Sequence, residues 1–266
     1  MPVAKPDDNL WQTLRQEVTE VARLEPALAS YFHIAVLSHD SLESALSYAL
    51  ASLLGSEVVS PLALFQVMEH GFAADSQISE RMRRDLLAHY QRDPACDRHY
   101  IPLLYFKGFH ALQAHRVAHW LWNHDRRSMA LYLQSRVSEI FSVDIHPAAR
   151  IGGGIMIDHA TGLVIGETAV IEDDVSILHA VTLGGSGLEK GDRHPTIRQG
   201  VLISAGAKIL GNITVGEGAK IGAGSLVVEP VPPHSTVAGV PARVVGGLLK
   251  TVPALDMDHG FNGENG

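Results

Sequence analysis

The chain has 266 residues, of which 46% are hydrophobic and 19% charged, and this balance argues against a disordered or fibrous protein. Its formal net charge is -8 and it has no basic run, so neither nucleic acid nor an anionic membrane is an expected partner. The longest uncharged apolar stretch, 44–56, is too short to cross a bilayer, and the N-terminus does not have the layout of a secretion signal. A single cysteine, Cys96, excludes an intrachain disulfide and suits a cytoplasmic location. The classes of protein that remain are an enzyme for small molecules and a scaffold.

The composition changes near residue 140, which predicts two different cores. Of the 25 glycines only Gly55, Gly71 and Gly108 precede this point, whereas nearly all aromatic residues do. We therefore expect an α-helical domain over 1–140, a second domain over 141–247 and a C-terminal tail over 248–266.

The first half is predicted to be helical. Ser41 is placed to cap a helix over 42–54 that Gly55 would end. Pro61 suits the first turn of the next helix, which Gly71 would end.

Further helices are expected from Asp75 or Ser76 to about Arg92, and twice within 107–141. The last of them carries an apolar stripe at helical spacing, which we interpret as core. The stripe consists of Met129, Leu133, Val137 and Ile140.

The second half contains an aliphatic repeat. Its positions carry only Ile, Leu or Val and step by six, except for eight residues after Ile157 and fourteen after Leu183. They are Ile145, Ile151, Ile157, Ile165, Ile171, Ile177, Leu183, Ile197, Ile203, Ile209, Val215, Ile221 and Val227. A period of six fits neither an amphipathic helix nor a hairpin, but it fits a short strand followed by a corner.

Three such units would form one triangular coil of eighteen residues, with the aliphatic side chains inside and glycine at the corners. The sequence therefore predicts an α+β protein whose helical domain is followed by a left-handed parallel β-helix of hexapeptide repeats. Prolines would end the stack, because proline cannot donate to a strand ladder. They are Pro230, Pro232, Pro233 and Pro241.

The two irregular steps are the expected places for function, because inserted residues must leave the stack. The first contains DHATG at 158–162, and the second is an arm over 184–195 that ends in Arg193, His194 and Pro195.

His159 is a candidate general base, because imidazole is the usual base near pH 7. Its second nitrogen would need a carboxylate, either the adjacent Asp158 or Asp144. With eighteen residues per coil, residue 162 would lie beside Asp144, three positions from His159. The alternative is that His159 is a corner residue that only bonds backbone.

Other chemistries have weaker support. Motifs of serine hydrolases, P-loops, dinucleotide-binding turns and zinc proteases are missing from the sequence. Four histidines of the repeat half are candidate zinc ligands, but no two lie within five residues of each other, and no metal is expected. They are His146, His159, His179 and His194. Cys96 is interpreted as a helix-end residue rather than a nucleophile.

Several segments together resemble the serine acetyltransferase family, whose members make O-acetyl-L-serine from acetyl-CoA and L-serine in cysteine biosynthesis. They are DPA at 93–95, PLLYFKGFHALQAHR at 102–116, DIHPAA at 144–149, DHATG at 158–162, VTLGGSG at 181–187, GDRHP at 191–195 and AGVPAR at 238–243. The hexapeptide repeat alone indicates acyltransferases broadly, whereas DHATG and GDRHP with this helical domain are specific. The resemblance extends from about residue 9 to about residue 247.

The resemblance implies that His159 takes the serine hydroxyl proton and that Asp144 orients it. Asp158 and His194 would help to hold the serine. Asp93 would contact the amine of the serine from the helical domain. The alternative is that Asp93 only caps a turn.

By the same resemblance Arg193 would pair with the serine carboxylate as a planar two-pronged donor. The alternative is an ion pair with Asp192 or another surface acid.

The resemblance also implies that acetyl-CoA lies between subunits, along an edge of the three-sided β-helix, which we call the prism. Ala205 and Ala223 are eighteen residues apart, so they would stack at one corner and leave room for a pantetheine arm. Gly184 and Gly185 would allow close approach near the thioester. The candidate cations for the phosphates are Lys220 and Arg243, with solvated surface charges as the alternative.

An assembly and a regulator are implied as well. Prisms would form trimers, two trimers would join through the helical domains as a hexamer, and L-cysteine would inhibit at the serine site. In the family a C-terminal Ile docks into O-acetylserine sulfhydrylase; this sequence ends at Asn265 and Gly266 instead, so that partnership has less support.

Three rival hypotheses make different predictions. An acetyltransferase for a sugar hydroxyl would have no use for Asp93 and Arg193 as amino-acid clamps. A β-helical carbonic anhydrase would contain zinc. A solenoid scaffold would have neither His159 in a bulge nor thioester turnover.

Overall fold

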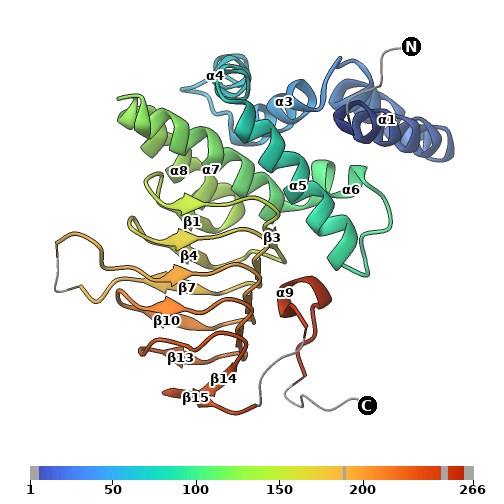
Figure 1. Cartoon of the computed structure of the whole chain (residues 1–266). Helices are drawn as coiled ribbons and strands as arrows, with labels where there is room; N and C mark the ends of the chain where they lie inside the picture. The colour runs from blue at the N-terminus through green and yellow to red at the C-terminus, as the bar shows by residue number, and fades with distance from the viewer. Residues whose placement is uncertain (1–5, 188–189, 247–250, 261–266) are drawn as a thin grey trace.

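The structure is a computed structural model that describes residues 6–187, 190–246 and 251–260. Figure 1 shows a layer of helices lying over one end of a three-sided stack of short strands. The chain leaves the helices at Phe141 and enters the first strand at Val143. Within the described ranges, none of the helices combines the length and apolar character needed to cross a membrane.

The helical part is built from eight α-helices within the described residues. They are α1 (Pro6–Leu24), α2 (Ala29–Phe32), α3 (Leu42–Leu54), α4 (Pro61–Ala74), α5 (Ser76–Arg92), α6 (Tyr100–Tyr105), α7 (Lys107–Asn123) and α8 (Arg127–Phe141), with a 3₁₀ turn (Pro26–Leu28) and a π-helical turn (His33–Leu37) beside α2.

The predicted N-terminal caps are confirmed. Ser41 Oγ accepts a hydrogen bond from Ser44 N at 3.1 Å at the start of α3, and Asp75 Oδ1 accepts one from Gln77 N at 2.9 Å at the start of α5. These side chains satisfy backbone donors that have no partner inside the helix.

Two details of the helical prediction are wrong. The helix α4 does not end at Gly71 but continues to Ala74, because Gly71 serves packing: a Cβ there would lie 2.8 Å from Val117 Cγ1 of α7. On α8, Leu133 and Val137 are buried as expected, but Ile140 is 42% exposed and lies outside the core stripe.

The second part is a β-solenoid of about five turns with three parallel sheets. The strand order is β1-β4-β7-β10-β13 in one sheet, β2-β5-β8-β11 in the next and β3-β6-β9-β12-β14 in the third, which the antiparallel β15 extends. The bounds are β1 (Val143–Ile145), β2 (Arg150–Ile151), β3 (Met156–Ile157), β4 (Leu163–Ile165), β5 (Val170–Ile171), β6 (Ser176–Ile177), β7 (Thr182–Gly184), β8 (Thr196–Ile197), β9 (Leu202–Ile203), β10 (Lys208–Leu210), β11 (Thr214–Val215), β12 (Lys220–Ile221), β13 (Leu226–Val227), β14 (Thr236–Gly239) and β15 (Ala242–Val244). The predicted parallel β-helix is confirmed, and its handedness stays a prediction.

The aliphatic repeat forms the core of the solenoid. All of its predicted positions are buried, with at most 6% of any residue exposed. Ile165 pairs with Leu183, an eighteen-residue coil, whereas Ile145 pairs with Ile165 and Ile171 with Ile197 across the two irregular steps.

The first coil is therefore longer than the sequence analysis assumed. Asp144 lies beside Val164, not beside residue 162. The two residues added by the first irregular step account for the difference.

Each coil turns at three corners, which we name by what they carry. The arm corner contains 146–149, 166–169 and the described residues of the arm, 185–187 and 190–195. The junction corner contains 152–155, 172–175 and 198–201, and the bulge corner contains 158–162, 178–181, 204–207 and 222–225.

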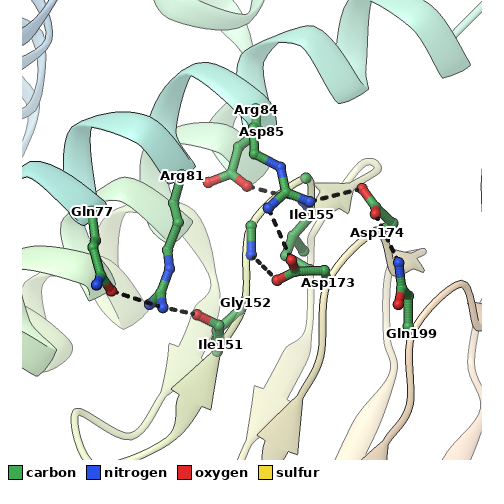
Figure 2. A network of polar contacts seen from close by, with 12 residues as sticks. Gln77, Arg81, Arg84, Asp85, Ile151, Gly152, Ile155, Asp173, Asp174 and Gln199 are labelled. Carbon is green, nitrogen blue, oxygen red and sulfur yellow. Dashed lines mark hydrogen bonds and ion pairs between the residues drawn. The ribbon is translucent and has the colours of Figure 1, made fainter.

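Polar contacts at the junction corner fix α5 to the solenoid (Figure 2). Arg84 pairs with Asp173 at 2.9 Å and with Asp174 at 3.2 Å, and Asp85 Oδ1 accepts from Ile155 N at 2.9 Å. Because these contacts join the helical part to the solenoid, they hold the middle of α5 over the first coils.

The described C-terminal segment packs beside the third sheet, where Figure 1 shows α9 (Pro253–Asp256). Ser176 Oγ donates to Ala254 O at 2.8 Å, and Ala254 N donates to Gly200 O at 3.3 Å. The remainder of the predicted tail, 248–250 and 261–266, lies outside the described residues, as do residue 247 and residues 188 and 189 of the arm.

Candidate active site

A cleft of about 370 Å³ lies between the helical part and the bulge corner. It brings together three of the predicted site residues, Asp93, Asp158 and His159. Its other lining residues are Ala95, Tyr105, Phe106, Lys107, Gly108 and Ile157. The cleft therefore joins the DPA turn after α5 to the DHATG bulge after β3.

The bulge holds His159 in a backbone conformation that costs free energy. His159 and Ala160 have φ values of 55° and 60°, in the left-handed region that residues other than glycine rarely adopt. Gly162 N donates to Ser142 O at 2.7 Å, and Ala160 is fully buried. Strain of this kind persists where the surroundings enforce it, and it is concentrated at functional sites.

The imidazole of His159 lies at the rim of the cleft, with 74% of its side chain exposed. Its Nε2 lies 3.8 Å from Asp158 Oδ2. The ring of His179, one coil further along the bulge corner, lies edge-on to it with centroids 5.8 Å apart. An accessible imidazole beside a carboxylate can accept a proton from a bound hydroxyl.

The N-terminal end of α7 packs directly against the bulge. A Cβ on Gly108 would lie 2.1 Å from Ile157 O, so only glycine allows this approach. Lys107 Nζ also donates to Thr161 Oγ1. Neither Lys107 nor Gly108 is among the residues predicted for the site, although both lie in the segment 102–116.

Asp93 caps a turn, which is the alternative considered for it, and also lines the cleft. Its Oδ1 accepts from Ala95 N at 2.8 Å, which caps the turn after α5. Among the described residues its Oδ2 has no hydrogen-bond partner, and the carboxylate lines the cleft. It remains free to bind a cationic group there.

Asp144 lies on β1 and is not among the residues that line the cleft. Its Oδ1 accepts from Gln134 Nε2 of α8 at 2.7 Å. The carboxylate nearest to the His159 ring among the described ion pairs is that of Asp158.

Arg193 and His194 lie at the arm corner, away from the bulge corner of the same chain. Arg193 Nη2 pairs with Glu167 Oε2 at 2.6 Å, the alternative partner type considered for it. This hydrogen bond lowers the pKa of Glu167. Glu167 is not among the residues predicted from the sequence, although the 26-residue coil between Ile171 and Ile197 also places 167 beside 193.

His194 is buried and held in one orientation. Its Nδ1 lies 2.9 Å from Thr168 Oγ1 and accepts from Thr168 N at 3.2 Å. A Cβ on Gly166 would lie 1.9 Å from its Nε2. Burial, reinforced by the neighbouring Arg193, lowers the pKa of His194, so the ring is neutral near pH 7.

The residues predicted for acetyl-CoA are divided between two corners. Ala205 and Ala223 stack at the bulge corner, where Gly224 N donates to Ala205 O at 2.8 Å. Gly184 and Gly185 lie at the root of the arm, and a Cβ on Gly185 would be 3.2 Å from Arg193 Cγ.

The two predicted phosphate cations have different surroundings. Lys220 is 3% exposed, and its Nζ donates to Asp258 O at 3.0 Å and to Gly260 O. Arg243 is exposed and lies 3.8 Å from Glu229. In this arrangement Lys220 holds the C-terminal segment, whereas Arg243 faces solvent.

Among the described residues, no three His, Cys, Asp or Glu side chains converge in the manner of a metal site. Cys96 is buried close to Asp93, and burial raises the pKa of its thiol to about 11. It is therefore protonated at neutral pH and is a poor nucleophile.

Comparison with known proteins gives a consistent result. A profile described as serine acetyltransferase, N-terminal, matches residues 10–114, and one described as bacterial transferase hexapeptide matches residues 194–228. The serine acetyltransferase of Salmonella typhimurium is 58% identical over 96% of this chain and 93% of its own length.

Solved structures of the same name superpose closely. The serine acetyltransferase of Vibrio cholerae has a TM-score of 0.94 at 58% identity, with 96% of this chain and 99% of that chain covered. A serine acetyltransferase in complex with cysteine has a TM-score of 0.93 at 53% identity, covering 96% and 99%. The Brucella abortus enzyme in complex with coenzyme A has 0.88 at 54%, covering 89% and 95%.

Proposed function

This chain belongs to the serine acetyltransferase family, and from that premise we propose that its cleft binds L-serine for acetylation by acetyl-CoA. The products are O-acetyl-L-serine and CoA. The observation that carries this proposal is the meeting of Asp93, Asp158 and His159 in one cleft. Two carboxylates suit an ammonium group, and an imidazole beside them suits a hydroxyl that must lose its proton.

In the proposed mechanism the serine oxygen attacks the thioester carbonyl directly. As the C–O bond forms, the hydroxyl proton passes to His159. Collapse of the tetrahedral oxyanion breaks the C–S bond and releases CoA as the thiolate, which takes up the proton from His159 and restores the neutral imidazole. No acyl-enzyme forms. General-base catalysis of this kind contributes roughly 10²- to 10⁴-fold in rate.

The test is serine-dependent release of thiol from acetyl-CoA by His159→Asn. We expect turnover to fall by about 10²- to 10⁴-fold while the fold is kept. His179→Asn is the matched control, because it removes the neighbouring imidazole of the same corner, and it should stay near wild type. A folded His159→Asn protein with wild-type turnover would overturn the assignment.

We further propose that Asp144 orients His159, whereas Asp158 binds the serine. The close contact between Asp158 and His159 makes the reverse assignment the alternative. Asp144→Asn should then lower kcat with little change in the serine KM, and Asp158→Asn should raise the serine KM. The opposite pattern would make Asp158 the orienting partner.

We propose that neighbouring chains complete the site within a trimer, two of which form a hexamer through the helical parts. The support is the separation of Arg193 and His194 from His159 at different corners of one chain. A neighbour's arm corner against this bulge corner would supply a cation for the serine carboxylate.

Mixing two inactive variants tests whether neighbouring chains complete one site. Trimers assembled at random from equal amounts of His159→Asn and Arg193→Met chains should regain about a quarter of wild-type activity, because one interface in four carries both intact residues. A site contained in one chain would regain none. Native mass spectrometry of the mixture supplies the assembly state.

We propose that acetyl-CoA runs along the bulge corner past Ala205 and Ala223. The coenzyme A complex of the Brucella abortus relative supports the ligand, and Arg243 is the accessible candidate for its phosphates. Ala223→Leu should raise the KM for acetyl-CoA and leave that for serine unchanged. An equal effect on both substrates would argue against this path.

L-cysteine is proposed as a competitive inhibitor at the serine cleft, because a thiol can occupy the place of the hydroxyl while the amine and carboxylate keep their contacts. The relative solved with cysteine supports this ligand. Inhibition that L-serine does not relieve would contradict it. Docking to O-acetylserine sulfhydrylase stays a prediction of the resemblance, since 261–266 lies outside the described residues.

A sugar acetyltransferase is the alternative on the same prism. Thiol release with galactosides in place of L-serine would favour it, whereas release with L-serine alone would exclude it.

A further inference from the structure

We propose that Arg92 is a positioning residue for the serine cleft: from a buried site it fixes Asp93 relative to the DHATG bulge. This inference rests on the proposed role of Asp93 in serine binding. Arg92 does not line the cleft, so any effect on substrate must pass through its neighbours.

Arg92 is the last residue of α5 and immediately precedes Asp93. Its side chain is 5% exposed, and its guanidinium group has three acceptors from the solenoid. Nη1 donates to Gly154 O at 2.9 Å and to Ser176 Oγ at 3.2 Å, and Nη2 lies 3.4 Å from Asp174 Oδ1. These three acceptors come from two successive coils.

The acceptors connect the two walls of the cleft. Gly154 is followed by β3, which leads without interruption into Asp158 and His159 on one wall. Arg92 leads directly into Asp93 on the other. One guanidinium group therefore holds the backbone next to Asp93 against the backbone that leads to the bulge, and their separation is set at this buried point.

The hydroxyl of Ser176 strengthens the arrangement. Because Ser176 Oγ donates its proton to Ala254 O at 2.8 Å, its lone pairs face Arg92. A planar guanidinium can reach two acceptors from Nη1 and a third from Nη2, whereas a compact ammonium cannot hold the same spread of acceptors. Lysine would keep the charge at this position and lose the geometry.

Arg84 provides a matched comparison within the same helix. It shares Asp174 as a partner, at 3.2 Å, and also pairs with Asp173 at 2.9 Å. It is 36% exposed and lies eight residues before Arg92. Arg84 thus carries the same charge to the same corner of the solenoid, but it does not adjoin Asp93.

The experiment compares Arg92→Lys with Arg84→Lys in the full-length protein in its native assembly. For Arg92→Lys we expect the serine KM to rise about tenfold or more, which is about 1.4 kcal/mol, with the acetyl-CoA KM within about twofold of wild type. For Arg84→Lys both values should stay within about twofold. Thermal unfolding of each variant records stability separately.

A merely structural role predicts another pattern. It would lower the melting temperature and impair both substrates alike, and Arg84→Lys would behave like Arg92→Lys. A folded Arg92→Lys protein with an unchanged serine KM would also overturn the proposal. If Arg92→Lys does not fold, Ser176→Ala decides, since it removes one acceptor and should raise the serine KM about twofold to fivefold, within the range of one lost hydrogen bond.

Different results would overturn the proposed function and the role of Arg92. Absence of serine-dependent thiol release in the wild-type protein would remove the proposed function itself. An active wild type with a normal Arg92→Lys variant would remove only the role of Arg92.

Discussion

The helical part buries several imidazoles, and we expect acidification below pH 6.5 to destabilise it. His89 is the clearest case, because it is 1% exposed and neither ring nitrogen has a hydrogen-bond partner. It lies edge-on between Phe106 and Phe109, with centroids 5.5 and 6.1 Å away. Burial, with smaller contributions from Arg92 and His110, lowers its pKa to about 3. Burial lowers the pKa values of His110 and His115 as well.

The sign follows from the protons bound in each state. Below an unfolded pKa of about 6.5, the unfolded chain protonates at His89 while the folded chain does not until about pH 3. The unfolded state therefore binds more protons, and stability falls as the pH falls through this window. At pH 5.5 the loss from His89 alone is about 1.4 kcal/mol, and near pH 4.5 it is about 2.7 kcal/mol. His110 and His115 act in the same direction.

The acids act in a separate pH window. Ion pairs and hydrogen bonds lower the pKa values of Glu43 and Asp173 below 4.5 and 3.8, their ordinary values. Their contribution to stability is therefore present above those values and is lost only at more acidic pH. Glu43 and Asp173 therefore do not contribute to the change between pH 7.5 and 5.5. Burial raises the pKa of Asp85 instead, and comparing wild type with an imidazole variant cancels its contribution.

The test is urea unfolding of wild type and His89→Leu at pH 7.5 and 5.5. Tryptophan fluorescence reports on the helical part specifically, because Trp11, Trp120 and Trp122 all lie there. We expect the stability of the variant relative to wild type to improve by about 1.4 kcal/mol between the two pH values. His124→Gln, at an exposed position, is the control. A difference that is the same at both pH values would refute the reasoning.

Three further predictions concern single contacts. Gly108→Ala should impair acetyl transfer and destabilise by about 1–3 kcal/mol in thermal unfolding, because its Cβ would meet Ile157 O at 2.1 Å; wild-type behaviour in both assays would contradict this contact. Cys96 should resist a disulfide reagent at pH 8 until the protein unfolds, since its thiol pKa is about 11, and rapid labelling of the folded protein would count against its burial. Lys220→Met should speed proteolytic cleavage within 251–260, because its ammonium holds Asp258 and Gly260, and an unchanged cleavage rate would show that other contacts hold the segment.

The solenoid could be predicted in detail because its determinants are local. Each aliphatic position specifies one strand, and the spacing specifies the register. Counting the two extra residues of the first irregular step gives Val164 as the partner of Asp144, which the assumption of eighteen residues per coil placed at 162. The helical part shows the limit. Gly71 reads as a stop signal in the sequence, but its role is set by Val117 on another helix, and no local pattern reports that distant partner. Arg92 is a similar case, since its acceptors are backbone and side-chain groups of remote coils.

Counting strands in the sequence also shows that the two insertions of the site, the bulge and the arm, lie at different corners. The bulge follows β3 and the arm follows β7, four strands later. In a three-sided solenoid a shift of three strands returns to the same corner, so a shift of four must reach the next one. His159 and Arg193 therefore belong to different corners whatever the conformation of the arm root. A cleft that requires both residues is thus most simply completed by a second chain, and for this reason the recovery of activity in mixed trimers is the decisive measurement for the assembly.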